Sequence, residues 1–234
     1  MADLSALELM RIHLDALYTY DAKGRMSHVN EARGPRAPRI FLGRTSAGHE
    51  LRWRADVLES TLASIAERVA REPSALPLSQ RPHCGDAIVS LLERDDPVVR
   101  IWSGPAYCVD VDALPTAPLV VRVTRANADL LRTFPDWRDE VDERQPFMAA
   151  VENGSVVALC ASVRITAAAH AAGVETLPAA RRRGMASQVV AAWARAVAEL
   201  GAIPLYSTSW DNVASQAVAR RLGMTLIGVD FHVT

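Results

Sequence analysis

The chain has 234 residues, of which 50% are hydrophobic and 23% are charged. This length and composition are typical of a globular protein with one large domain or two modest ones, and they exclude a coiled coil, a collagen-like repeat and long disorder. The 26 basic and 27 acidic residues give a net charge of −1, so no overall basic field favours nucleic acid or anionic lipid as a partner.

The compartment of the protein and the presence of a metal site are predicted from apolar runs, cysteine spacing and possible metal ligands. No apolar run reaches the roughly 18–20 residues of a membrane helix, and the N-terminus has charges at helical spacing instead of an apolar signal sequence. Cys84, Cys108 and Cys160 have no paired spacing, so we expect no disulfide framework and a cytoplasmic protein. His83 and Cys84 are adjacent and have no partner pair, so no metal site is predicted.

The first 115 residues alternate between helical and extended patterns. Apolar residues at helical spacing predict the helices, and short apolar segments between turn residues predict the strands. In chain order we expect a helix over 4–20, a hairpin turn at 20–26, an irregular loop at 33–38, strands at 40–42 and 51–53, a helix over 56–71, a loop through Pro73, Pro77 and Pro82, a short helix over 85–92 and a strand at 98–102.

Prolines mark the best candidate for a domain boundary. Pro115 and Pro118 lie within four residues of each other, and this spacing favours extended chain over helix. We therefore expect an N-terminal α/β accessory region of unknown role over 1–115 and a second domain over 116–234.

The second half predicts a mixed α/β (α+β) fold. In chain order we expect a strand at 119–123, a helix at 127–134, strands at 147–151 and 156–166, a strand at 170–177, a helix over 182–200, a strand at 203–208, a helix over 212–222 and a final strand over 224–233. Asn153-Gly154 between the second and third of these strands is a strong hairpin signal. The longest helix follows the fourth strand.

One strand-to-helix loop is the strongest candidate for a functional site. Arg181, Arg182, Arg183 and Gly184 stand between the strand at 170–177 and the long helix. The first N–H groups of a helix are unpaired and attract anions, and a glycine lets a phosphate approach closely. Arginine side chains add donors that match phosphate oxygens. The segment predicts a phosphate site, with a surface arginine cluster as the alternative.

Two motifs resemble the GNAT superfamily of acyl-CoA N-acyltransferases. Arg181-x-x-Gly184-x-Ala186 matches the R/Q-x-x-G-x-G/A signature of that family. The segment 210–224 is similar to the family pattern in which an asparagine, here Asn212, opens a helix that ends in Leu-Gly-Met. The resemblance covers about residues 117–234, and the order of elements agrees with it.

The resemblance implies a fold and a cofactor site. The fold is a mixed β-sheet whose fourth and fifth strands splay apart at its centre, flanked by helices, with acetyl-CoA as the acyl donor between those strands. The residues implied in binding are Thr176 and Leu177 for the pantetheine, the backbone around Arg181, Arg182, Arg183, Gly184, Met185 and Ala186 for the pyrophosphate, and Asn212 and Ser215 from the next helix.

The resemblance also implies direct acyl transfer to an amine. A base must take a proton from the attacking ammonium, and His170 lies where the family often places that group; Glu175 is the alternative. Many family members use a tyrosine of the last helix as the acid, but Ala219 occupies that position here. Tyr206 is the substitute that we expect.

These motifs predict an N-acetyltransferase that acts on an amine of a small molecule, peptide or protein. The alternative is a non-catalytic acyl-CoA-binding regulatory or interaction module. A nucleotide-binding domain is disfavoured because the chain lacks G-x-x-x-x-G-K-[ST] and G-x-G-x-x-G loops. Exposed strand edges in this fold often pair two subunits, so a homodimer is expected.

Overall fold

The chain forms two compact α+β units. The computed structural model describes residues 4–73, 78, 81–116 and 120–234. The first unit contains Met1–Tyr107 together with Ser207–Asn212 and Leu226–Thr234, and the second contains Cys108–Tyr206 and Val213–Thr225. The domain boundary expected near residue 115 stays a prediction. The C-terminal segment Leu226–Thr234, which was expected in the second domain, makes its contacts within the first unit.

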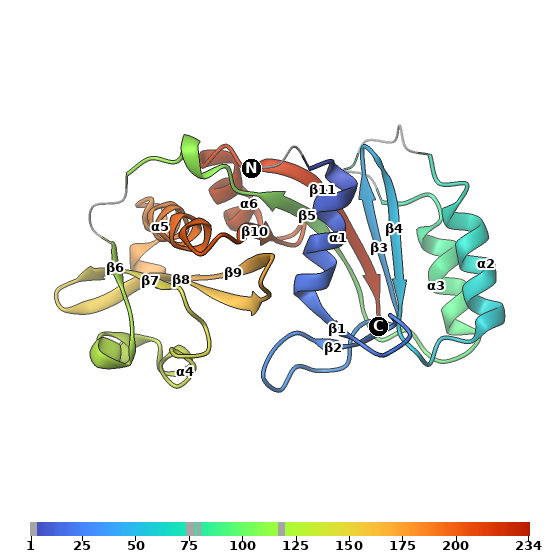
Figure 1. The fold of residues 1–234 in the computed structure, drawn as a ribbon, viewed down its shortest axis with the longest axis horizontal. Coiled ribbons are helices and arrows are strands. Elements are labelled where there is room, and N and C mark those ends of the chain that lie inside the picture. The colour runs from blue at the N-terminus through green and yellow to red at the C-terminus, as the bar shows by residue number, and fades with distance from the viewer. Residues whose placement is uncertain (1–3, 74–77, 79–80, 117–119) are drawn as a thin grey trace. The chain divides into compact units, whose positions relative to one another are not determined.

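The first unit is built on an antiparallel sheet with helices on both faces (Figure 1). Its elements are α1 (Ala6–Leu17), β1 (Tyr18–Tyr20), β2 (Met26–Val29), β3 (Ile40–Thr45), β4 (Gly48–Trp53), α2 (Glu59–Val69), α3 (Gly85–Glu93), β5 (Ile101–Cys108) and β11 (Thr225–Val233). The strand order is β4-β3-β11-β5, and β1 and β2 form a separate hairpin. Ile40, Leu42 and Phe231 pack with α2 and α3 in a buried core.

The second unit is a mixed sheet with the strand order β10-β9-β8-β7-β6. Its elements are η1 (Val111–Ala113), β6 (Val120–Arg122), η2 (Arg125–Thr133), α4 (Pro135–Arg138), β7 (Phe147–Glu152), β8 (Ser155–Ile165), β9 (Ala169–Thr176), η3 (Pro178–Ala180), α5 (Met185–Glu199), β10 (Ile203–Ser207) and α6 (Val213–Arg221). β10 is parallel to β9, and the other neighbours are antiparallel. The α+β class predicted from the sequence is confirmed.

The two faces of this sheet are covered by different helices (Figure 1). α5 lies on one face and contributes the fully buried Trp193. η2 and α4 lie on the other face, where Leu131 and Phe134 pack against Phe147 and Leu159 of the sheet. A residue on a central strand therefore faces α5 or faces η2 and α4, according to its parity along the strand.

β9 and β10 stay paired over only part of their length. Ile203, Pro204 and Leu205 of β10 pair with Ala169, His170 and Ala171 of β9. β9 continues to Thr176, and over that stretch its pairing is with β8 on the other side. The predicted separation of the fourth and fifth strands of this half of the chain is found here, and it leaves the β10-facing edge of residues 172–176 unpaired by β10.

The hairpin at Asn153-Gly154 is confirmed. Asn153 has φ 49° and Gly154 has φ 71°, so both central residues are left-handed. A two-residue turn of this kind matches the twist of the flanking strands, and asparagine followed by glycine tolerates it best. The turn joins β7 to β8 and sets their register, in which Glu152 pairs with Ser155.

Several predicted elements differ in bounds or type from those of the structure. The helix expected over 4–20 ends at Leu17, where the chain turns into β1, and the helix expected over 182–200 begins only at Met185. The segment expected as a helix at 127–134 is mostly 3-10 helix, and the strand expected at 98–102 lies at Ile101–Cys108. Pro77 and residue 119 lie outside the described residues.

Three further properties concern the described part of the chain. Cys84, Cys108 and Cys160 are buried and form no disulfide. Within residues 4–73, 78, 81–116 and 120–234, no helix has the length and apolar character needed to cross a bilayer. The same residues hold no group of three or more His, Cys, Asp or Glu side chains placed to bind a metal ion.

Candidate functional site

The loop before α5 has an unusual backbone. Arg182 has φ 61° and Gly184 has φ 80°, and Gly184 is the N-cap of α5. Two left-handed residues so close together turn the chain sharply from η3 into the helix, and this turn delays the start of α5 to Met185. Glycine adopts such a conformation without strain, whereas arginine adopts it at a cost of about 1–2 kcal/mol.

The same turn leaves a row of backbone donors without acceptors. Gln188 is the first residue of α5 to donate to the preceding turn, from its N–H to the carbonyl of Gly184 at 3.2 Å. Within the described residues, the N–H groups from Arg182 to Ser187 donate to no backbone carbonyl. α5 has 15 residues, so its dipole adds positive potential at this end. The arrangement is chemically suited to bind an anion such as a phosphate.

The arginine side chains of the loop differ in their contacts. Arg181 Nε donates to the carbonyl of Thr176 at 3.4 Å, so this side chain lies back over the end of β9. Arg183 forms a forked ion pair with Glu152, at 2.9 Å and 2.6 Å, and this contact raises the pKa of its guanidinium. Arg182 is exposed. Of the three predicted arginines, Arg183 is therefore already ion-paired with the carboxylate of Glu152.

A fourth arginine, which the sequence interpretation missed, lies at this helix end. A Cβ built on Gly184 would lie 3.2 Å from Nη1 and 3.3 Å from Nη2 of Arg221, in the last turn of α6. A guanidinium beside the positive end of a helix dipole is electrostatically unfavourable unless an anion lies between them. The pair Arg220-Arg221 just before Leu222-Gly223 was the available signal in the sequence.

Replacement of Arg221 tests whether its guanidinium serves an anion. We expect Arg221→Ala to weaken acetyl-CoA binding about 10-fold, because a hydrogen bond to a charged group contributes roughly 1.5–3 kcal/mol and this one is solvent-exposed. Titration calorimetry measures the change in Kd. Arg220→Ala is the matched control, since it removes the same charge from the neighbouring position of α6. Equal effects of the two variants would assign the loss to net charge alone.

β9 leads directly into this loop and has backbone groups facing away from β8. The N–H of Leu177 donates to the carbonyl of Val157 at 2.9 Å, so Leu177 is bonded toward β8. Because bonding alternates along an antiparallel pair, the backbone groups of Thr176 and Val174 face the other way. The contact of Arg181 with the Thr176 carbonyl is consistent with this direction. The open edge of β9 thus offers polar backbone to an extended ligand.

His170 lies on the α5 face of β9 and is nearly buried. Its Nδ1 is 2.9 Å from Oγ of Ser162, and Ser162 Oγ accepts a hydrogen bond from Trp193 Nε1 at 3.0 Å. Burial lowers the pKa of the imidazole below its usual value, so the ring is neutral at pH 7. His170 pairs with Pro204 just before β9 and β10 separate.

Glu175 lies on the opposite face of β9 from His170. Its carboxylate accepts a hydrogen bond from Trp137 Nε1 at 2.6 Å. Trp137 also covers Gly173, where an added Cβ would lie 2.9 Å from the indole ring. The Arg144 guanidinium lies 4.8 Å from the centre of that ring. The two candidate bases therefore have different environments, and Glu175 is the exposed one.

Tyr206 and Ser215, which were predicted separately, are in direct contact. The Tyr206 hydroxyl lies 2.5 Å from Oγ of Ser215 and 3.4 Å from its carbonyl oxygen. Tyr206 is buried on β10, and Ser215 is half-buried on the first turns of α6. Ala219 of α6 is also buried. Asn212, the remaining predicted residue, is exposed and belongs to the first unit, where its N–H donates to the Ser209 carbonyl at 3.1 Å.

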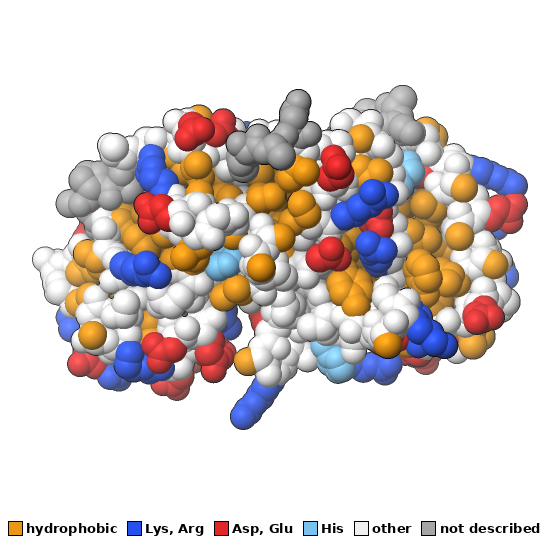
Figure 2. All heavy atoms as spheres, viewed as in Figure 1, with side chains coloured by type: hydrophobic (Ala, Val, Ile, Leu, Met, Phe, Trp, Pro, Cys, Tyr) orange, Lys and Arg blue, Asp and Glu red, His pale blue; other side chains and the backbone are white. Residues whose placement is uncertain are grey.

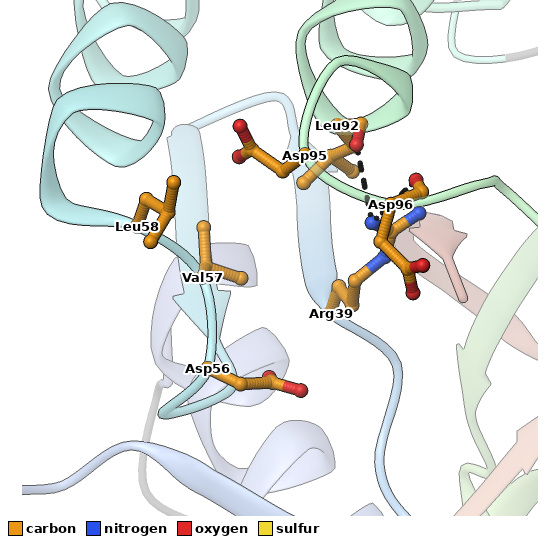
Figure 3. A pocket seen from close by; sticks show the side chains of 7 residues that line it. All are labelled: Arg39, Asp56, Val57, Leu58, Leu92, Asp95 and Asp96. Carbon is orange, nitrogen blue, oxygen red and sulfur yellow. Dashed lines mark hydrogen bonds between the residues drawn. The ribbon is translucent and has the colours of Figure 1, made fainter.

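A separate cavity lies in the first unit and contains none of the predicted site residues. It has a volume of about 160 Å³ and is lined by Arg39, Asp56, Val57, Leu58, Leu92, Asp95 and Asp96 (Figure 3). The Arg39 guanidinium donates to the carbonyls of Leu92, Asp96 and Pro97 at the end of α3. These contacts satisfy the carbonyls of a helix C-terminus, so the arginine has a structural role there.

One family model matches most of the second half of the chain. Residues 121–228 match the family model described as GNAT acetyltransferase. The match includes the loop before α5, the open edge of β9, and Tyr206, Ser215 and Arg221. A comparison with curated proteins found no match.

The chain also matches solved structures, at low sequence identity. One is a putative GNAT acetyltransferase of Novosphingobium aromaticivorans (17% identity, 58% of this chain and 65% of that chain, TM-score 0.49). A second is a GCN5-related N-acetyltransferase-like protein of Streptococcus suis, with 16% identity over 85% of this chain and 85% of that chain and a TM-score of 0.48. A third is an aminoglycoside N-acetyltransferase in complex with CoA, with 20% identity over 44% of this chain and 89% of that chain and a TM-score of 0.37. The resemblance of this chain to the GNAT acetyltransferases rests on the family model and covers residues 121–228.

Proposed function

We propose that the protein is an N-acetyltransferase that transfers an acetyl group from acetyl-CoA to an amine of a small molecule, peptide or protein. The observation that carries the proposal is the row of unpaired N–H groups from Arg182 to Ser187, within a segment that matches the GNAT acetyltransferase model. Arg221 beside Gly184 adds positive charge at the same point. We further propose that the protein acts in the cytoplasm and forms a homodimer.

The donor is proposed to lie along the second unit from α5 to the open edge of β9. The pyrophosphate binds the N–H groups of Arg182, Arg183, Gly184, Met185 and Ala186. The pantetheine arm pairs with the backbone of Thr176, with Ser215 as a further contact. The prediction for Leu177 is corrected, because its N–H is bonded to the Val157 carbonyl and its carbonyl accepts from the Ala180 N–H. An arm that follows β9 from Thr176 back to Ala171 runs along five residue-to-residue steps of the strand, roughly 16 Å. Its thioester then lies where β9 and β10 separate.

The transfer requires one proton to leave the amine and one to reach the sulfur. The neutral amine nitrogen attacks the thioester carbonyl, the new C–N bond forms, and the C–S bond breaks as CoA leaves. The amine proton passes to a base, for which His170 and Glu175 are the candidates. The departing thiolate takes a proton from an acid, for which we propose Tyr206. Its hydroxyl is held by Ser215, so the two side chains act as one hydrogen-bonded unit.

Binding of the donor is the first test. With ligand at about 100 times Kd, binding stabilises a protein by about 2.7 kcal/mol, which is roughly 5–10 °C in Tm for a chain of this size. We expect such a shift with acetyl-CoA and with CoA, and none with ATP at the same concentration. A shift of the same size with ATP would identify the loop as a general phosphate site.

Catalysis is tested separately, by release of the CoA thiol. A panel of primary amines that includes aminoglycosides, polyamines and peptides with free N-termini or lysines supplies the acceptors. We expect thiol release above the hydrolytic background with at least one class. Donor binding without thiol release from any amine would favour a non-catalytic acyl-CoA-binding module.

A further inference from the structure

Three buried side chains from three elements form a hydrogen-bonded chain. Trp193 Nε1 of α5 donates to Ser162 Oγ of β8 at 3.0 Å, and the same oxygen lies 2.9 Å from Nδ1 of His170 on β9. Trp193 is 0% exposed, Ser162 is 1% and His170 is 6%. Of these three residues, the sequence analysis singled out His170 alone.

The direction of each hydrogen bond in this chain can be assigned. An indole N–H only donates, so Ser162 Oγ is the acceptor from Trp193. The single hydroxyl proton of Ser162 needs an acceptor, and within the described residues the only one recorded for it is His170 Nδ1. Nδ1 therefore carries the lone pair, and the proton of the neutral ring is on Nε2.

His170 Nε2 is accessible. No hydrogen bond from Nε2 to any described residue is recorded, and the atom is not among the fully buried polar atoms that lack a partner. His170 pairs with Pro204, one residue before the last recorded pair of β9 and β10, which is Ala171 with Leu205. Its side chain lies on the α5 face of β9, and its Nε2–H is a donor with no recorded protein partner near the point where the two strands separate.

We propose that His170 acts as a hydrogen-bond donor to the acyl oxygen of the thioester, through Nε2–H, and does not act as the general base. The inference rests on the proposed acyl transfer. Negative charge develops on the carbonyl oxygen as the amine attacks, and a fixed donor stabilises it without giving up its proton. An Nε2 that already carries a proton has no lone pair with which to take another. The amine proton then passes to solvent water and not to His170.

Ser162 and Trp193 are positioning residues in this scheme. The hydroxyl of Ser162 holds the tautomer of His170, and the indole of Trp193 fixes the direction in which that hydroxyl donates. Burial lowers the pKa of His170, which keeps the ring neutral and the assignment valid at pH 7. The Trp193–Ser162–His170 network thus sets both the position of the His170 ring and the nitrogen that carries its proton.

The tautomer can be measured without any substrate. The full-length protein is labelled with 15N-histidine, and long-range 1H–15N correlations of the imidazoles are recorded at pH 7.5, with His170→Gln used to assign His170 among the six histidines. We expect a protonated Nε2 and an unprotonated Nδ1. Ser162→Ala should lose this preference, and Trp193→Phe, which keeps the Ser162 hydroxyl, should retain it. A protonated Nδ1 in the wild type would overturn the inference.

Kinetics distinguish a donor from a base at the same position. Removal of an oxyanion donor typically costs 10²–10³-fold in kcat, so we expect about a 100-fold loss for His170→Ala. His170→Gln places an amide N–H near the position of Nε2 but cannot accept a proton at neutral pH, and we expect it to stay within about 10-fold of wild type. Equal loss in both variants, with intact acetyl-CoA binding, would overturn the donor role and leave the transferase proposal standing.

Failure of the proposed function gives a different result. In that case neither the wild-type protein nor any variant releases CoA thiol with any amine, so His170→Ala and His170→Gln show no difference in turnover. The measured tautomer would still report on the Trp193–Ser162–His170 chain, but the assignment of a donor to the acyl oxygen would be overturned.

Discussion

Replacement of Gly184 by aspartate is expected to abolish measurable acetyl-CoA binding. The left-handed φ of 80° at this position disfavours any residue with a Cβ. A Cβ here would lie 3.2 Å from the Arg221 guanidinium, so the new carboxylate would pair with Arg221 and with the free N–H groups of α5. It would occupy the place that we assign to the pyrophosphate and would repel the phosphate charge.

The other end of the same helix provides the control for this variant. Gly201 follows α5 and has φ 78°, and a Cβ added to it would have no neighbouring atom within 4 Å. Gly201→Asp therefore introduces the same charge at a left-handed position, away from the N–H groups. Titration calorimetry with acetyl-CoA should show loss of binding for Gly184→Asp and retention for Gly201→Asp. An unchanged Kd in the Gly184 variant would remove the loop from the donor site.

Replacement of Trp193 by alanine is expected to give the largest loss of stability. Trp193 is the largest of the fully buried side chains and packs between α5 and the sheet. Truncation of a buried tryptophan to alanine typically costs 3–5 kcal/mol, because apolar contacts are lost and a cavity remains. The Ser162 hydroxyl would also lose the donor that orients it.

The stability of the Trp193 variants should be measured without tryptophan fluorescence, because each substitution removes one of the fluorophores. Urea unfolding followed by far-UV circular dichroism gives the change in the midpoint and in the free energy of unfolding. Trp193→Phe is the matched variant, since it keeps an aromatic ring and loses the indole N–H; we expect it to retain most of the stability that Trp193→Ala loses. A loss below about 1 kcal/mol for alanine would mean that the α5 face repacks around the site.

Much of the second unit could be predicted from local sequence, because its signals are local. Asn153-Gly154 specified the hairpin, and Leu222-Gly223 marked the end of α6. The start of α5 was misplaced, because Arg182 was expected inside the helix. Nothing in the side chain of an arginine signals a positive φ, and the conformation follows from the turn that Gly184 completes.

The contacts between elements were less predictable. Arg221 approaches Gly184 only because α6 returns across the end of α5, a relation that one sequence does not show. The Ser162–His170 contact depends on the register of β8 and β9, which contains an irregularity between Ser162 and Arg164. For the same reason the sequence left Glu175 open as the alternative to His170, whereas the structure places them on opposite faces of β9.

On the face drawn in Figure 2, red acidic and blue basic side chains are interspersed and do not gather into one basic area. Local charge, such as that of Arg221 beside the first turn of α5, therefore acts at short range and is not reinforced by the protein as a whole.

The parting of β9 from β10 has a consequence for self-association. An unpaired strand edge normally invites another chain to add a strand, and proteins blunt such edges to avoid aggregation. Here the pairing at Ala171 and Leu205 closes one end of the opening, so an incoming strand cannot run the length of β9. A thin, flexible ligand can enter where a second polypeptide cannot, and the fold thereby keeps a hydrogen-bonding edge without the usual risk of polymerisation.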